Sequence, residues 1–153
     1  MLKHQLLTEI LWVIIAALLA IAVLALPILN AGEFQYQWEN AAVIFGFITL
    51  LRLIFFHKQA IWLRPKPMKA IVCVAMVPVF LFTVLTINNV QTHVDAHGFA
   101  GLFGIVESES LIQWGRYIRN EVVFFGAALL ICALILPVVL IIEVWRQVKG
   151  FSL

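Results

Sequence analysis

Long uninterrupted apolar runs, rather than alternating apolar and polar positions, dominate this chain. They lie at about 10–29, 39–62, 70–87 and 121–143. A helix needs about 20 apolar residues to cross the roughly 30 Å hydrocarbon core of a bilayer. The second run reaches that length if Arg52 extends its charged group toward the headgroups. The pattern predicts an all-α bundle of four transmembrane helices.

Composition supports the same class of protein. Hydrophobic residues make up 64% of the 153 residues and charged residues only 12%, against about 45–50% and about 25% in soluble domains. A soluble globule of this size could not bury that excess, so we expect one integral membrane domain, 1–153, whose apolar surface faces lipid. The first run is longer than the apolar core of a signal peptide and is interpreted as an uncleaved anchor. The net charge of +2 is too small to indicate nucleic-acid binding.

Basic residues are distributed unevenly between the two sides of the four predicted spans. Lysine and arginine are retained on the cytoplasmic side of a membrane. The side that holds both termini is therefore predicted to be cytoplasmic, and the segment 88–120 to form a cap on the outer face of a membrane, expected to be the bacterial inner membrane. The first side carries Lys3, Lys58, Arg64, Lys66, Lys69, Arg146 and Lys149, whereas the second carries only Arg116 and Arg119.

The predicted cap begins with a group of potential metal ligands. His93, Asp95 and His97 share one face in a strand, and in a helix the two histidines pair at positions i and i+4. Imidazole and carboxylate groups are normal zinc and copper ligands. The group is incomplete, because a fourth ligand would have to come from Glu107, Glu109 or another chain. A solvated polar loop with locally hydrogen-bonded histidines is the alternative interpretation.

The rest of the predicted cap is apolar, glycine-rich and then amphipathic. We expect the glycine-rich part to cover the mouth of the bundle or to form a docking surface for a partner subunit. A capping box at Ser110 and Gln113 predicts that an amphipathic interfacial helix begins there and runs toward the fourth span. The residues expected to contact partners on this outer face are Gly98, Phe99, Gly101, Phe103, Gly104, Trp114, Arg116 and Arg119.

Arg52 is the one charge well inside a predicted span. It lies near the cytoplasmic end, at the same depth as Glu9 and Glu143, so a structural ion pair with either would fix the order of the helices. An arginine in a span is also a candidate for a transport pathway. The prolines at 78 and 137 could kink two helices and open a small cavity for such a pathway.

No motif of a serine hydrolase, a phosphate-binding loop or a zinc protease occurs in the chain. We therefore expect a non-catalytic accessory or scaffold subunit that associates with other membrane subunits or with itself. The pairs Ala16-xxx-Ala20 and Ala42-xxx-Gly46 would permit close helix contacts. A metal-dependent protein using His93, Asp95 and His97, and a small transporter using Arg52, are the alternatives.

Overall fold

Four long helices account for most of the protein. The computed structural model describes residues 2–104 and 108–150, and contains no strand in those two ranges. Three single-turn 3₁₀ helices lie in the connections. The elements are α1 (Leu2–Ala31), α2 (Gln37–Phe56), η1 (His57–Gln59), η2 (Ile61–Leu63), α3 (Lys66–His97), η3 (Ala100–Phe103) and α4 (Glu109–Val148).

Each of α1 to α4 is long enough and apolar enough to cross a membrane. The prediction of an all-α protein with four helices able to span a membrane is therefore confirmed for the described residues. The outward faces of the helices expose large aliphatic and aromatic side chains, while their inward faces are buried. Such a surface is stable only where lipid covers it, because a soluble monomer rarely exposes contiguous apolar patches of this extent.

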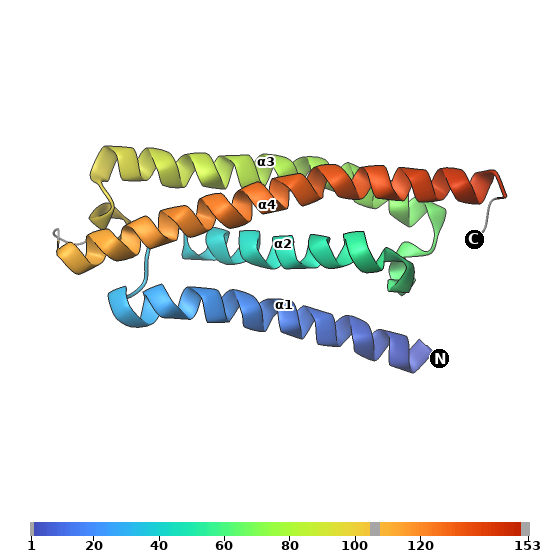
Figure 1. The fold of residues 1–153 in the computed structure, drawn as a ribbon, viewed down its shortest axis with the longest axis horizontal. Coiled ribbons are helices and arrows are strands. Elements are labelled where there is room, and N and C mark those ends of the chain that lie inside the picture. The colour runs from blue at the N-terminus through green and yellow to red at the C-terminus, as the bar shows by residue number, and fades with distance from the viewer. Residues whose placement is uncertain (1, 105–107, 151–153) are drawn as a thin grey trace.

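The helices run alternately up and down, so the two ends of the molecule differ in content (Figure 1). The described ends of the chain lie at one end, together with the α2–α3 connection; we call this the termini end. The α1–α2 and α3–α4 connections form the cap end. Across the molecule the order is α1, α2, α4, α3, and α4 packs on both α2 and α3, which make few contacts with each other. The last helix is thus the central one.

Within the described part of the chain, two buried apolar clusters fill the interior, one nearer each end. The cluster at the termini end is built from α2, α3, α4 and the connection between α2 and α3. The cluster at the cap end also includes Ala20 and Leu24 of α1. Ala16 and Ala20 are both buried, so this small-residue pair serves packing inside the protein. Gly46 of α2 similarly lies against the Leu129 side chain of α4.

The start of α3 differs from its sequence interpretation. The third apolar run begins at residue 70, and because an X-Pro pair favours extended chain, Pro65 and Pro67 predict an extended basic loop before it. Instead Pro65 is the N-cap and Pro67 lies in the first turn, so α3 starts at Lys66. Proline is tolerated there because the first turn of a helix does not use its amide N–H groups. Lys69 consequently lies inside the helix and is buried.

The cap end contains more helix than the predicted cap over residues 88–120 indicated. α3 continues through His97 and ends at Gly98, whose φ of 72° suits glycine. The amphipathic segment forms the first turns of the 40-residue α4 rather than a separate helix. The predicted capping residue Ser110 was wrong, because the side chain of Ser108 accepts the hydrogen bond from the Leu111 amide at 3.4 Å. The helix therefore begins two residues earlier than the capping box indicated.

At Gly115 of α4 the backbone of the cap packs directly against the helix. A Cβ atom built at this position would clash with the carbonyl oxygen of Phe99 and lie 2.8 Å from the Phe99 carbonyl carbon. Backbone atoms cannot move aside as a flexible side chain can, so we expect Gly115→Ala to destabilise the protein by about 1–3 kcal/mol. Thermal unfolding in detergent measures the effect.

Gly46→Ala is the matched control for that substitution. A Cβ atom there would meet only the Leu129 methyl groups, at 3.4 and 3.5 Å. The gain in helix propensity of up to about 1 kcal/mol then makes this variant neutral or stabilising. Equal unfolding temperatures for Gly115→Ala and the unaltered protein would contradict the packing described for the cap.

Candidate functional site

The two cap-end histidines lie side by side on the last turns of α3. Their rings stack with centroids 4.6 Å apart, at an angle of 28°. His93 Nε2 lies 3.2 Å from the Gly101 carbonyl oxygen, and His97 Nδ1 lies 3.3 Å from the His93 carbonyl oxygen. In each contact the ring N–H donates to a carbonyl. Each ring therefore uses one of its two nitrogens in a backbone hydrogen bond and keeps the other.

Asp95 does not join the two histidines. It follows His93 by two positions, which in a helix is a rotation of about 200°, and its side chain is exposed to the surroundings. Among residues 2–104 and 108–150, no group of three or more His, Cys, Asp or Glu side chains is placed to hold a metal ion. Glu107, considered from the sequence as a further ligand, lies outside the described residues.

The glycine-rich segment closes the cap end over the helices. Leu102 and Phe103 are buried, and Phe103 packs edge-on against Phe34, which lies between α1 and α2. The Gln35 amide donates to the Leu102 carbonyl oxygen at 2.8 Å, which joins the two connections at this end. The segment therefore packs inward, as expected for a cover of the bundle mouth.

The remaining residues expected to make outer-face contacts lie around this cover. Arg116 places its guanidinium carbon 5.6 Å from the centre of the Phe99 ring, and the Trp114 ring packs edge-on against Tyr117. Gly104 adopts the left-handed conformation that ends η3. Arg116 is exposed, and Arg119, Gly98, Gly101, Phe99 and Trp114 are half-buried.

A buried polar pair joins α2 to α4 beneath the cap. Asn40 Nδ2 donates to Glu121 Oε1 at 3.0 Å. Asn40 is 0% exposed and Glu121 is 7% exposed. Neither Asn40 Oδ1 nor Glu121 Oε2 has a hydrogen-bond partner among the described residues. Sequence reasoning missed this pair, because it assigned both residues to the water-facing boundary of their spans.

At the termini end, Arg52 of α2 pairs with Glu9 of α1. Arg52 Nη2 lies 2.7 Å from Glu9 Oε2, and the exposed fractions of the two side chains are 8% and 16%. The Arg52 guanidinium also lies over the Trp12 ring, with its carbon 5.6 Å from the ring centre. Trp12 in turn stacks on Phe56 at the end of α2. These contacts hold the first half of α1 to α2.

Glu143 pairs with residues other than Arg52. Its Oε1 lies 3.0 Å from the Nζ of Lys69, and its Oε2 lies 3.5 Å from His57 Nε2. The first contact joins α3 to α4, and the second joins η1 to α4. The sequence placed Lys69 in the basic loop before the third span. Because Lys69 lies inside α3 instead, its pairing with Glu143 was not predicted.

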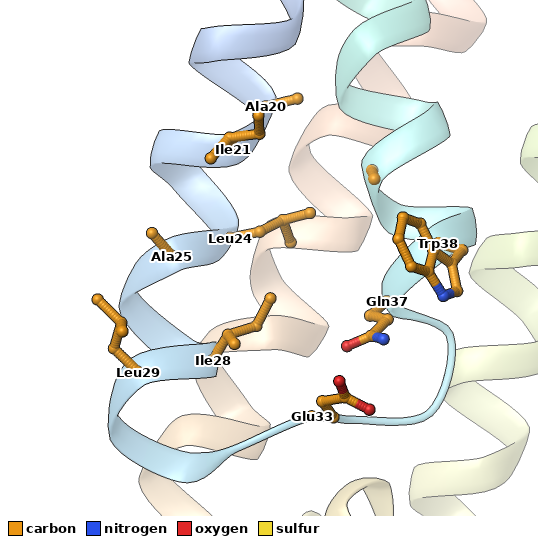
Figure 2. A pocket seen from close by; sticks show the side chains of 10 residues that line it. Ala20, Ile21, Leu24, Ala25, Ile28, Leu29, Glu33, Gln37 and Trp38 are labelled. Atoms are coloured by element: carbon orange, nitrogen blue, oxygen red, sulfur yellow. The ribbon is translucent and has the colours of Figure 1, made fainter.

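A groove runs between α1 and α2 on the outside of the bundle, near the cap end. Its volume is about 440 Å³. In Figure 2, Leu24 and Ile28 extend from α1 toward α2, while Glu33 and Gln37 lie together where the connection enters α2. The Gln37 side-chain oxygen is buried and has no hydrogen-bond partner in the described part of the chain. The groove is apolar along its length and carries hydrogen-bond acceptors at one end.

Comparison with known protein families, with curated proteins and with solved structures found no match to this chain.

The Asn40–Glu121 pair yields a prediction about stability. Asn40→Leu removes the one hydrogen bond that the buried carboxyl group makes among the described residues, and we expect it to lower the free energy of unfolding by about 1–2 kcal/mol. Glu121→Gln keeps an acceptor oxygen opposite Asn40 and removes a buried ionisable group, so we expect no loss of stability. Unfolding of both variants in one detergent measures this difference, and equal losses would show that the hydrogen bond is unimportant.

Proposed function

We propose that this protein is a non-catalytic accessory subunit of a larger membrane complex, and that a transmembrane helix of a partner occupies the groove between α1 and α2. Its location in this proposal is the bacterial inner membrane, with both termini in the cytoplasm. The single observation that carries the proposal is the apolar α1–α2 groove, with its small side chains and a buried, unpartnered Gln37 oxygen.

The first support is the use that the chain makes of its buried charged groups. Arg52 is paired with Glu9, and Lys69 with Glu143, across neighbouring helices. Each of these groups is therefore committed to holding one helix against another. In the described ranges, none of these ion-paired side chains lines the groove between α1 and α2. This is the arrangement expected of a structural frame.

The second support is the chemistry of the groove. Helices in lipid associate through close packing and interhelical hydrogen bonds, because lipid is as apolar as the helices themselves. Ala20, Ala25 and Ala41 line the groove and leave room for a neighbouring helix. A donor on that helix, such as a lysine, arginine or tryptophan side chain, would satisfy the Gln37 oxygen once the Gln37 side chain rotates toward the groove, since that oxygen is buried in the free protein. The exposed Glu33 carboxylate nearby favours a basic residue at that position.

The third support concerns orientation. The termini end carries the exposed basic residues Lys58, Arg64 and Lys66, whereas the exposed carboxylates Glu33, Asp95 and Glu109 lie at the cap end. Because basic segments stay on the cytoplasmic side, this distribution favours a cytoplasmic termini end. The groove then opens in the outer half of the bilayer.

Site-specific photo-crosslinking in native membranes tests this proposal. A photoreactive phenylalanine analogue at Ala25, inside the groove, should yield a discrete adduct with one membrane protein. The same analogue at Ala22, which is exposed on α1 and does not line the groove, should react with lipid alone. Gln37→Leu combined with the Ala25 probe should reduce the protein adduct several-fold, since it removes the acceptor that a partner would use.

Two results would contradict the proposal. One is an Ala25 probe that reacts only with lipid, because a lipid chain would then fill the groove. The other is an adduct of equal yield at Ala25 and Ala22, because that would indicate random collisions in the membrane. The thermal unfolding of each variant provides the check that the fold is unchanged.

A further inference from the structure

A second groove lies on the opposite flank of the molecule, between α3 and α4. It consists of two adjoining hollows of about 540 and 420 Å³, which meet at Cys73. On α3 its lining extends from Lys66 to Leu81, a distance of about 22 Å at 1.5 Å per residue. That exceeds half of the roughly 30 Å hydrocarbon core. The groove is long enough to hold the tail of a lipid from one leaflet.

The walls of this groove are apolar except at its termini end. Aliphatic and aromatic side chains line the deeper hollow, including Met76, Phe80 and Leu134, and Pro137 forms part of its wall. The Cys73 thiol donates to the Pro137 carbonyl oxygen at 3.9 Å, so the thiol has a partner within the protein. The deeper hollow thus suits an acyl chain and offers little to a polar ligand.

The mouth of the groove is positively charged. Lys66 and Lys69 line it from α3, and Trp145 lines it from α4. The ammonium group of Lys149 lies 4.1 Å from the centre of the Trp145 ring. Lys69 is 2% exposed and is paired with Glu143. Lys66 is exposed and makes no ion pair among the described residues, so its charge remains uncompensated.

The first turn of α3 increases this imbalance. The N-terminus of a helix carries a partial positive charge and is normally stabilised by acidic side chains. The first turn of α3 contains no acidic residue, its N-cap makes no side-chain hydrogen bond, and it contains Lys66 instead. An anion beside Lys66 would relieve the repulsion between the lysine and the helix dipole. Such an anion would lie at the end of the groove where a lipid headgroup belongs.

From this charge complementarity we infer that the α3–α4 groove is a binding site for one anionic phospholipid. Its phosphate lies at Lys66 and the start of α3, and one of its tails occupies the two hollows that meet at Cys73. Clusters of lysine at a membrane surface attract anionic headgroups in general. The apolar groove next to these lysines also accommodates an acyl chain, so it can bind one lipid molecule at a defined position. The site is independent of the α1–α2 groove and of the partner proposed for it.

Native mass spectrometry of the purified protein in detergent tests the inference. The probes are phosphatidylglycerol and phosphatidylcholine with identical acyl chains. We expect one phosphatidylglycerol molecule to bind each chain more tightly than phosphatidylcholine. Lys66→Gln should weaken phosphatidylglycerol binding roughly fivefold, the effect of losing one basic side chain near the headgroup. Lys58→Gln, an exposed lysine outside the groove lining, should leave the affinity unchanged.

A second pair of variants tests the position of the tail. Ala70 is exposed and lines the hollow nearer the termini end. Ala70→Trp should therefore fill that hollow and weaken the binding of phosphatidylglycerol. Ala127 is exposed on α4 and lines neither hollow, so Ala127→Trp should have no effect. Equal affinity for the two lipids, or equal losses with Lys66→Gln and Lys58→Gln, would overturn the inference. So would full affinity in Ala70→Trp, which would indicate attraction to the headgroup alone.

Discussion

The structure depends on polar contacts that link α4 to its neighbours at both ends. At the cap end Glu121 accepts a hydrogen bond from Asn40 of α2, and at the termini end Glu143 pairs with Lys69 of α3. In lipid the apolar faces of helices do not by themselves favour one neighbour over another. Polar groups that would be costly to leave unpaired can supply that preference. They place the last helix between α2 and α3, which precede it in sequence (Figure 1).

α1 is attached differently from the other three helices. Its cap-end half contributes Ala20 and Leu24 to a buried apolar cluster. Its other half contributes to neither cluster and is held by the Arg52–Glu9 pair and by Trp12, which stacks on Phe56. A helix attached by a few polar and aromatic contacts leaves apolar surface on both sides of the attachment.

The apolar runs were sufficient to predict four membrane helices, because length and hydropathy decide whether a helix crosses a bilayer. They could not give the order in which the helices pack. That order follows from Asn40, Lys69, Glu121 and Glu143, of which the first three were assigned to boundaries or loops. One signal was present in the sequence: Asn40 and Glu121 each lie at the outer end of an apolar run, so they occupy the same depth. The depth of Lys69 could not be predicted, because the X-Pro pairs at the start of α3 also indicate extended chain.

The predicted metal-site residues were likewise foreseen only in part. Spacing alone placed His93 and His97 together, whereas it could not decide whether Asp95 would join them, since that depends on strand or helix geometry. The helix separates Asp95 from the histidines, and their ring N–H groups are occupied by backbone carbonyls. The grooves could not be foreseen, because a groove arises from the spacing between helices and leaves no pattern along one of them.

Buried charges in this protein fix the arrangement of its helices. A double-mutant cycle on Arg52→Leu and Glu9→Leu tests this claim most directly, with the free energy of unfolding measured for each single variant and for the pair. If the ion pair attaches α1, each single variant leaves one largely buried charge without its partner. The double variant then loses less free energy of unfolding than the sum of the two single losses. Strictly additive losses would contradict the claim, since Arg52 and Glu9 would then not act on each other.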